Sequence, residues 1–406
     1  MSNVTSADVR GREERWARQP FTLYAATLMT FMAASSVPTP LYRLYQESWG
    51  FSPSTLTVIF GVYALSLLCA LLTVGSLSDH VGRKPVILFA IGLELVSVVL
   101  FLAAAGPAWL IAARILQGIA TGAAMGALSA GLIDADQARA SLYNSLAPLV
   151  GLALGALGCS ALVDLAPAPL HLVFVLLFII LLIEFGAVVF APETTKRRPG
   201  AMCSLRPKVH VPAESRRDLL LALPISVAGW SLGGLYLSLI PTIVRHVTGS
   251  TLALTSGAVV AALASVGAIS ILVARPHPAR HIIIVSSAML ALGVVTTLSG
   301  VIEGAVAVML AGRVVAGVGF GAGFLGALKT TLSHVSPDDR AGLMSAFLIV
   351  SYVAFSGPAM IAGLCIGVFG LVQTAIGYGI ATILLSLVAF VAALRKAPSP
   401  QLETIR

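Results

Sequence analysis

Charged residues and cysteines are scarce in this sequence. Only 10% of its 406 residues are charged and 58% are hydrophobic, whereas about a quarter of the residues of a soluble domain are charged. This composition excludes an ordinary soluble protein. The four cysteines are scattered, three inside apolar blocks (Cys69, Cys159 and Cys365) and Cys203 in a basic loop. Their spacing excludes a disulfide framework and a zinc site.

Several other motifs and segments are absent. The sequence has no H-E-x-x-H motif and no Gly-Lys pair, which excludes a zinc protease and a P-loop ATPase, so we expect no enzyme. No metal site or cofactor is expected either. The N-terminus lacks the pattern of a signal peptide, because residues 1–20 are polar and the apolar block Phe21 to Val37 runs on into a Pro-Thr-Pro turn. We expect this block to remain as a first membrane helix.

Long apolar blocks separated by short polar breaks fill the rest of the chain, and each is long enough to cross a bilayer. They predict an all-α polytopic membrane protein with twelve transmembrane helices in two pseudo-symmetric six-helix bundles, and with both termini on one side. The predicted helices span residues 21–43, 54–77, 85–105, 108–133, 140–164, 169–191, 218–244, 251–274, 281–301, 304–333, 341–364 and 369–394.

The distribution of basic residues predicts the orientation. The net charge is +8, but the basic residues lie in short strips between apolar blocks, which favours membrane topology over nucleic-acid binding. Of the 25 Lys and Arg residues, only Arg43 and Arg245 fall in loops opposite the termini, and Arg114, Arg313 and Lys329 fall within helices. The remainder lie on the side of the termini. The positive-inside rule therefore predicts an inner-membrane protein with cytoplasmic termini.

The two halves of the chain are similar in sequence. A hydrophilic linker at 192–217 separates bundles at 21–191 and 218–394, and polar tails occupy 1–20 and 395–406. Arg114-Ile-Leu-Gln-Gly opens the fourth predicted helix and Arg313-Val-Val-Ala-Gly opens the tenth, at an offset of 199 residues. Such a duplication suggests a transporter with its site at the midplane between two repeats. The expected partners are a small-molecule substrate and the lipid bilayer, and the expected functional unit is a monomer.

The loop between the second and third predicted helices carries the strongest motif. It reads Gly75-Ser-Leu-Ser-Asp79-His-Val-Gly82-Arg83-Lys84-Pro and resembles the G-x-L-x-D-x-x-G-R-K/R-P signature of the major facilitator superfamily. The resemblance implies a latch between the halves, with Asp79 at the N-terminus of the eleventh helix. Arg83 is a candidate partner for Asp134, which ends the fourth helix on the same side. Alternatively, the loop serves only to orient the chain.

A second motif points to proton coupling. Arg114, Gln117 and Gly118 resemble the R-x-x-Q-G motif of twelve-span drug/proton antiporters in this superfamily. A guanidinium does not release its proton, so Arg114 needs a carboxyl partner or an anionic ligand. Glu94 and Glu184 lie within the third and sixth predicted helices and are candidate proton carriers. Alternatively, each stays protonated and bonds to a neighbour.

Further prolines and glycines are candidate hinges. Pro38-Thr-Pro resembles the P-x-P motif of the antiporters, and Gly357-Pro358 resembles their eleventh-helix motif with Ala359 in place of Leu. In the fifth predicted helix Ala147 replaces the first residue of the Gly-Pro pair, which weakens the antiporter assignment against a symporter. These residues also let helices bend and approach closely. The four candidate hinges are Pro148, Gly151, Gly357 and Pro358.

The candidates for the substrate cavity are apolar, aromatic and basic residues of the first, seventh and tenth predicted helices. Packing or lipid contact also explains the apolar ones. Lys329 alternatively extends its charged end to the membrane interface. The candidates are Met29, Met32, Pro38, Trp230, Tyr236, Arg313, Phe320, Phe324 and Lys329. The leading functional hypothesis is proton-driven efflux of small amphipathic or hydrophobic compounds by alternating access, with the proton gradient as the energy source. The alternatives are a proton-linked importer of a sugar, organic acid or amino acid, and a non-transporting membrane sensor.

Overall fold

Helices are the only regular secondary structure among the residues that the computed structural model describes. The structure describes residues 6–239, 242–243, 249, 252–333, 335–336 and 339–395, with side chains from Pro20 onward. Twelve described helices are long and apolar enough to cross a membrane, which confirms the predicted fold class and number of spans.

The N-terminal half contains eight helices in chain order. They are α1 (Ser6–Ser36), α2 (Pro38–Trp49), α3 (Pro53–Val74), the single turn α4 (Ser78–Val81), α5 (Arg83–Leu102), α6 (Pro107–Ala135), α7 (Gln137–Leu165) and α8 (Leu172–Phe190). The linker adds two short turns, α9 (Ala201–Ser204) and η1 (Ala213–Ser215). The C-terminal half contains α10 (Arg216–Ser238), α12 (Ala253–Ala274), α13 (Ala279–Glu303), α14 (Val306–Thr331), α15 (Arg340–Phe369) and α16 (Leu371–Arg395).

The first span consists of two helices. α1 ends at Ser36, and α2 restarts at Pro38 with proline in its first turn. Proline fits the first turn because it lacks the N–H that would find no partner there. The Pro-Thr-Pro segment therefore breaks the helix rather than ending it, and the span continues to Trp49.

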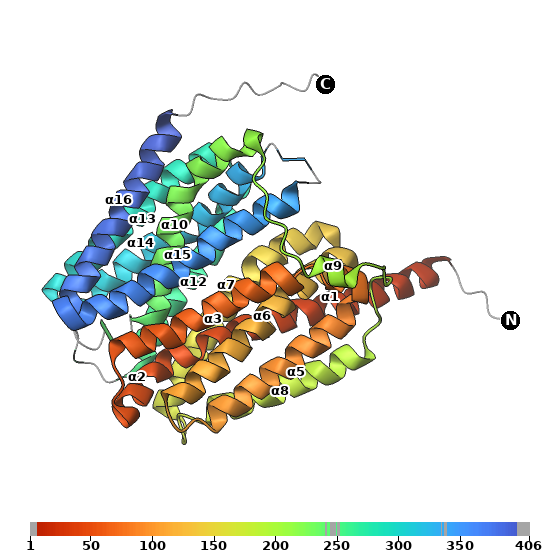
Figure 1. Cartoon of the computed structure of the whole chain (residues 1–406), viewed down its shortest axis with the longest axis horizontal. Helices are drawn as coiled ribbons and strands as arrows, with labels where there is room; N and C mark the ends of the chain where they lie inside the picture. Colours follow the sequence, from red (N-terminus) through yellow and green to blue (C-terminus); the bar gives the residue numbers. More distant parts are fainter. Residues whose placement is uncertain are drawn as a thin grey trace.

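The two halves lie side by side and meet through two helix pairs (Figure 1). α3 packs against α15, and α7 packs against α12. Small residues allow close approach: a Cβ atom added at Gly363 of α15 would collide with the Thr57 side chain of α3. Such small-residue contacts are typical of helix packing in membranes.

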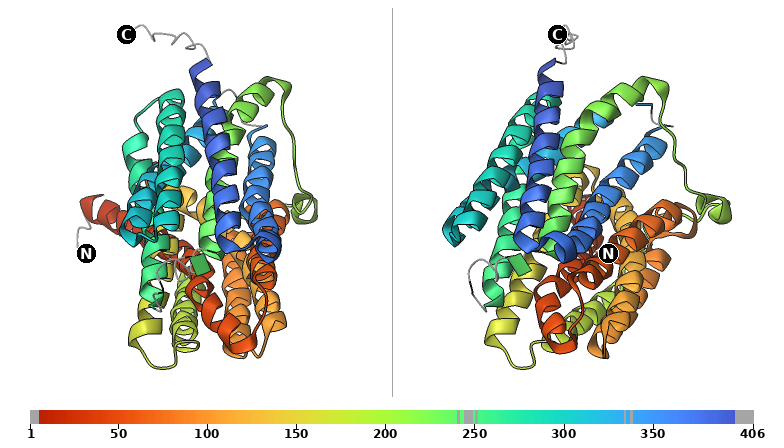
Figure 2. Two further views of the ribbon diagram at one scale, coloured as in Figure 1. Left: turned by 90° about the vertical axis from the view of Figure 1, so that its left-hand side faces the viewer. Right: turned by 60° about the vertical axis from the view of Figure 1, so that its left-hand side comes forward.

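The halves are joined more tightly at one end than at the other. At the end opposite the linker, Thr39 Oγ1 donates to the Leu237 carbonyl at 3.1 Å and Ser54 Oγ donates to the Gly363 carbonyl at 3.0 Å. The ends of α3 and α15 on the linker side diverge (Figures 1 and 2). We call these the far side and the linker side of the molecule.

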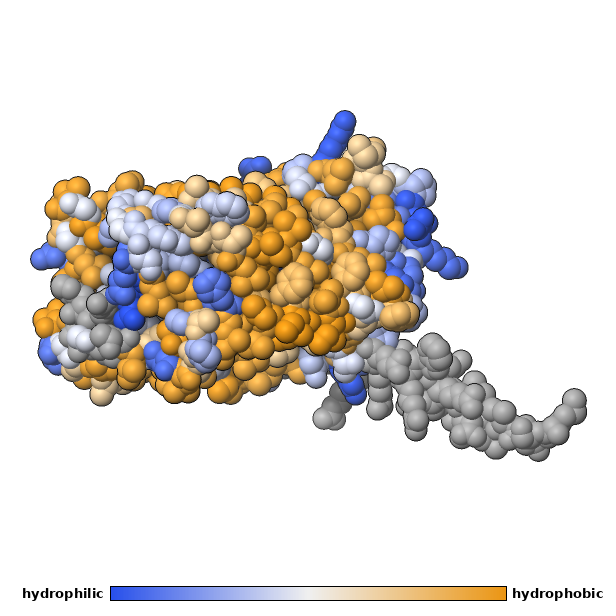
Figure 3. All heavy atoms as spheres, turned by 90° about the horizontal axis from the view of Figure 1, so that it is seen from below, coloured by the Kyte–Doolittle hydropathy of each residue, from blue (hydrophilic) through white to orange (hydrophobic). Residues whose placement is uncertain are grey.

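The outer surface is suited to lipid. Apolar residues dominate the face seen in Figure 3. On α8, for example, Leu182 and Ile183 are 53% and 66% exposed. Large apolar side chains with this exposure would be unfavourable in water, and their arrangement around the bundle fits a surface that contacts acyl chains.

Candidate functional site

A cavity of about 230 Å³ lies between the two halves. Its wall includes residues of α1, α3, α6 and α7 from the first half and of α10, α12, α14 and α15 from the second. Arg114 is the one charged side chain among the described residues that line it. The cavity therefore offers a mainly apolar environment with a single fixed positive charge.

Aromatic side chains of the second half form one wall of the cavity. The Trp230 ring lies 6.0 Å from Phe324, 5.0 Å from Tyr352 and 5.7 Å from Phe355 between ring centroids. Phe355 also reaches Phe60 of α3, at 5.0 Å. This cluster joins the halves and offers aromatic faces to an apolar or cationic solute.

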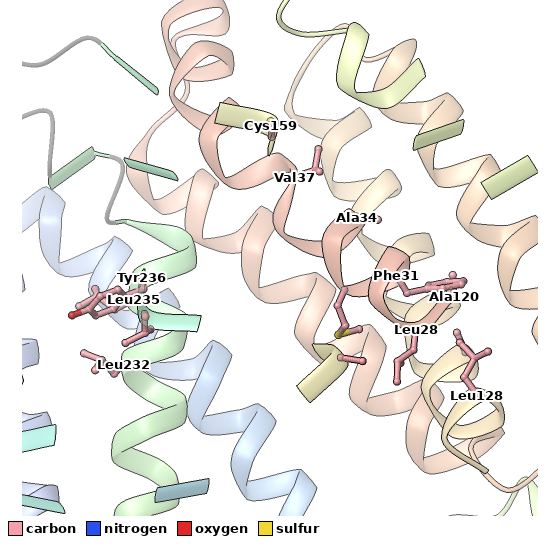
Figure 4. Close-up of a cluster of buried hydrophobic side chains, with 14 of the residues drawn as sticks. Leu28, Phe31, Ala34, Val37, Ala120, Leu128, Cys159, Leu232, Leu235 and Tyr236 are labelled. Carbon is pink, nitrogen blue, oxygen red and sulfur yellow. The ribbon is translucent and has the colours of Figure 1, made fainter. Parts of the chain in front are cut away.

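Arg114 is held in place by α1 and by its own helix. Its Nη1 donates to the Ser35 carbonyl at 3.0 Å and to Gln117 Oε1. The guanidinium also lies over the Tyr63 ring, 4.4 Å from its centroid. Further along the same pair of helices, Phe31 of α1 lies next to Ala120 of α6 (Figure 4). Arg114 is thus fixed where two cavity helices meet.

Glu94 lies behind Arg114, away from the cavity wall. Gln117 Nε2 donates to Glu94 Oε1 at 2.9 Å and to the Ala34 carbonyl at 3.2 Å. Gln117 therefore connects the guanidinium on the cavity wall to a completely buried carboxyl, whose Oε2 has no partner among the described residues. A carboxyl in this position can be neutral or charged without leaving the network, because Gln117 donates to it in both states.

Arg313 occupies the matching position of the second half in a different environment. Its side chain is fully buried, and no hydrogen-bond partner for any of its three guanidinium nitrogens occurs among the described residues. The guanidinium lies over the ring of Tyr236, 4.2 Å from the centroid. Tyr236 lines the cavity whereas Arg313 does not, so the aromatic ring separates this second charge from the cavity.

The difference between the halves lies in two substitutions. At the offset of 199 residues, Glu94 and Gln117 correspond to Gly293 and Ala316. α13 and α14 touch at these residues, and a Cβ atom added at Gly293 would collide with the backbone of Ala316 and Gly312. The second half therefore retains the arginine without the glutamine that bonds to it in the first half and without the carboxyl beyond that glutamine.

Comparison with known proteins identifies the family. Residues 23–277, more than half of the chain, match the model of the Major Facilitator Superfamily. The chain belongs to the Major Facilitator Superfamily. No curated protein matches the sequence significantly. The family and fold are those of membrane transporters and not of enzymes.

Solved structures of other members of the Major Facilitator Superfamily share the fold. A bacterial homologue of the human lysosomal transporter Spinster, solved in an inward-facing and unoccupied conformation, has a TM-score of 0.76 and 15% identity, covering 95% of this chain and 99% of that one. The nucleoside transporter NupG has a TM-score of 0.69 and 11% identity, covering 94% of this chain and 100% of that one. A mutant form of NupG gives a TM-score of 0.73 at 11% identity, covering 93% and 100%. At these identities the likeness concerns the fold alone.

The family's signature loop folds against the end of the first half. Gly82 adopts a φ of 105°, which glycine tolerates and other residues rarely adopt. Arg83 Nε donates to Asp134 Oδ2 at 2.9 Å, as its position in the sequence suggested, and Arg83 also pairs with Asp79. No described hydrogen bond joins Asp79 to α15, the eleventh span. In this structure the charged residues of the loop stay within the first half.

Glu193, which the sequence analysis did not single out, anchors the linker to this loop. Its carboxylate accepts from the backbone N–H groups of Arg83 at 2.9 Å and Lys84 at 3.1 Å, at the start of α5. Lys84 Nζ donates to the Val189 and Ala191 carbonyls near the end of α8. The sequence offered one signal: Glu193 is an acidic residue directly after a span, on the same side of the membrane as the loop. Acidic side chains are stabilised near the N-terminus of a helix, and α5 begins in this loop.

The other predicted residues are distributed as follows. Met32, Pro148, Trp230, Tyr236, Phe320 and Phe324 line the cavity. Met29, Pro38, Gly151, Arg313, Lys329, Gly357 and Pro358 are not among its lining residues in the described part of the chain. Lys329 Nζ donates to the carbonyls of Arg275 at 2.6 Å and His277 at 3.1 Å beyond the end of α12. Gly75 directly follows α3, and Glu184 accepts from Thr30 Oγ1 of α1 at 2.7 Å.

Proposed function

We propose that this transporter exports small amphipathic or hydrophobic molecules in exchange for protons. The observation that carries the proposal is the link from the cavity to a buried carboxyl through Arg114, Gln117 and Glu94. The apolar and aromatic cavity wall suits a substrate of this class. Residues of both halves of one chain line the cavity, so a monomer suffices.

Electrostatic competition between a proton and a cationic substrate explains how such a network couples proton influx to substrate efflux. When Glu94 is ionised, its negative charge offsets the charge of Arg114 through the bridging Gln117. When Glu94 binds a proton, the charge of Arg114 on the cavity wall is no longer compensated, which disfavours a positively charged substrate. Proton uptake and binding of a cationic amphiphile thus oppose each other, as exchange transport requires.

The direction follows from the expected orientation. We place the linker side in the cytoplasm because the linker and the short loops on that side carry most of the basic residues. In this orientation the halves diverge toward the cytoplasm and are joined at the outer side. A substrate would then enter from the cytoplasm or from the inner leaflet and leave outside after the halves rock.

Efflux of a lipophilic cationic dye from energised whole cells tests the proposal. Cells that overproduce the protein are expected to extrude the dye until a protonophore collapses the gradient, and Arg114→Ala is expected to abolish extrusion. Glu214→Gln, which alters an exposed linker carboxyl, is the control and should behave like the unaltered protein. Efflux that persists without a proton gradient would refute the proposal.

A proton-linked importer of a polar metabolite is the second candidate. Asn144, Ser145 and Ser226 lie on the cavity wall and offer hydrogen bonds to a polar solute. Accumulation of a labelled sugar, organic acid or amino acid, together with no effect on dye extrusion, would favour this function.

A further inference from the structure

A groove of about 570 Å³ runs along the outside of the second half, between α10 and α16. The two helices lie side by side (Figure 2) and pack against each other. Leu384, Val388 and Val391 of α16 line the groove together with Leu221 of α10. The groove is separate from the central cavity, and none of its lining residues belongs to the transport machinery described above.

The apolar part of the groove faces the membrane. Leu384, Val388 and Val391 follow one another at intervals of four and three residues, so they share one face of α16. They are 57%, 55% and 41% exposed. From Leu384 to Arg395 the face is about 16 Å long at 1.5 Å per residue, which gives an acyl chain an extended apolar surface.

Two arginines lie at one end of the groove. Arg217 is the second residue of α10 and Arg395 is the last residue of α16, and the two antiparallel helices bring both to the linker side. Neither guanidinium has a hydrogen bond or ion pair within the described part of the chain. The groove therefore combines an apolar floor with a doubly positive end at the expected level of the lipid headgroups.

Among the residues that the structure describes, the neighbouring charged groups do not neutralise this end. Asp218 is buried and accepts from Ser333 Oγ at 3.4 Å. Arg280 donates to the Ala393 and Leu394 carbonyls, each at 2.9 Å, at the C-terminal end of α16. Because Arg280 already satisfies these carbonyls, Arg395 is not needed to cap the helix. The charge of the site is therefore available to an anionic ligand.

We infer that this groove binds one anionic phospholipid, with its phosphate between Arg217 and Arg395 and an acyl chain along α16. Charge complementarity selects an anionic lipid over a zwitterionic one, because juxtamembrane arginines attract anionic headgroups. The bound lipid bridges α16 to α10, which carries Trp230 and Tyr236 into the cavity. It would thereby help to position a helix of the transport site.

Native mass spectrometry of the full chain, purified in detergent with added phosphatidylglycerol or phosphatidylethanolamine, tests this inference. The unaltered protein is expected to retain one phosphatidylglycerol in preference to phosphatidylethanolamine. The double variant Arg217→Ala/Arg395→Ala should retain roughly tenfold less, because each basic residue near a membrane surface contributes appreciably to anionic-lipid binding. Val388→Trp, which fills the apolar part of the groove, should lower retention of both lipids.

The control is Arg197→Ala/Arg198→Ala, which removes two exposed positive charges from the linker and should leave retention unchanged. Thermal unfolding curves that match the unaltered protein establish that each variant is folded. Equal retention by the two double variants, or equal retention of the two lipids, would overturn the inference. It would also be overturned if lipid bound only after removal of residues 396–406, or if the groove held a second copy of the chain.

Discussion

Arg114 and Arg313 lie at matching positions of the two halves, and only Arg114 has hydrogen-bond partners among the described residues. The motif around Arg114 was visible in the sequence, and both Glu94 and Glu184 were candidate proton carriers because they are carboxyls within predicted spans. The bridging position of Gln117 between Arg114 and Glu94 depends on how α5 and α6 pack, which the spacing of residues within one helix does not specify.

Replacing Glu94 with glutamine tests the carboxyl at the residue scale. Glu94→Gln keeps the size and an acceptor for Gln117 but cannot exchange a proton, so proton-driven efflux should fall at least tenfold, as expected for loss of a proton carrier. Substrate exchange without a gradient should persist. Glu184→Gln is the matched control: its carboxyl bonds to Thr30 and not to the Arg114 network. A larger effect of Glu184→Gln would transfer the role to that residue.

Arg313 provides a second test, on stability. Arg313→Met removes a buried charge that has no hydrogen-bond partner in the described structure and should raise the free energy of unfolding by about 1 to 4 kcal/mol. Arg114→Met should lower it, since it leaves the Ser35 carbonyl and Gln117 without their donor. Thermal unfolding in detergent measures both.

Transport by Arg313→Met should nevertheless decrease, because an intramembrane charge that makes no hydrogen bond among the described residues is a functional-site hypothesis by default. A variant that is both more stable and fully active would show that Arg313 serves neither structure nor transport.

At the scale of helices, the sequence predicted the number and order of the spans because apolar length alone decides which segments cross a bilayer. The helix ends were harder to predict. The backbone of α1 is helical from Ser6, in a segment expected to be a polar tail, and it continues through Pro20. Polarity alone does not end a helix, so the composition of the tail did not indicate where this helix begins. The linker was expected as a separate segment, and its attachment through Glu193 was missed because the donors are backbone N–H groups, which sequence patterns do not distinguish.

Glu193→Ala tests this attachment. Loss of the carboxylate leaves the first N–H groups of α5 without their acceptor and should release the start of the linker. Proteolysis after Arg197 and Arg198 should then accelerate roughly fivefold, an effect of the size expected for the loss of a helix cap. Glu214→Ala removes an exposed acid further along the same linker and serves as the comparison. Equal cleavage rates for the two variants would contradict the anchoring role.

At the scale of the molecule, the two bundles are joined at the far side and diverge on the linker side (Figure 2). Asp164 contributes to the far-side junction: its two carboxylate oxygens accept from the backbone N–H groups of Ala253 at 3.0 Å and Leu254 at 2.7 Å. The sequence suggested rocking bundles through its repeat. The sequence could not indicate which end of the molecule is closed, because the same sequence must encode both the arrangement closed at the far side and the one closed at the linker side.

Cross-linking can distinguish the arrangement that is closed at the far side from the one that is closed at the linker side. In a chain whose four native cysteines are replaced, Asp164→Cys with Leu254→Cys should form a disulfide without substrate and should stop transport, because the far side can no longer open. Asp79→Cys with Arg340→Cys should cross-link only when the linker side closes. Rapid transport by the oxidised Asp164–Leu254 pair would argue against alternating access through this junction.

The tight contact of α13 with α14 at Gly293 limits how this protein can change. Because the backbone of the adjacent helix occupies the space that a side chain would need, no single substitution can install a second carboxyl there without separating two packed helices. A substitution at Glu94 could remove the buried carboxyl of the first bundle. A substitution at Gly293 could not easily place a carboxyl at the matching position of the second bundle. Under the proposed exchange mechanism, backbone geometry therefore limits this pair of matched positions to one titratable carboxyl.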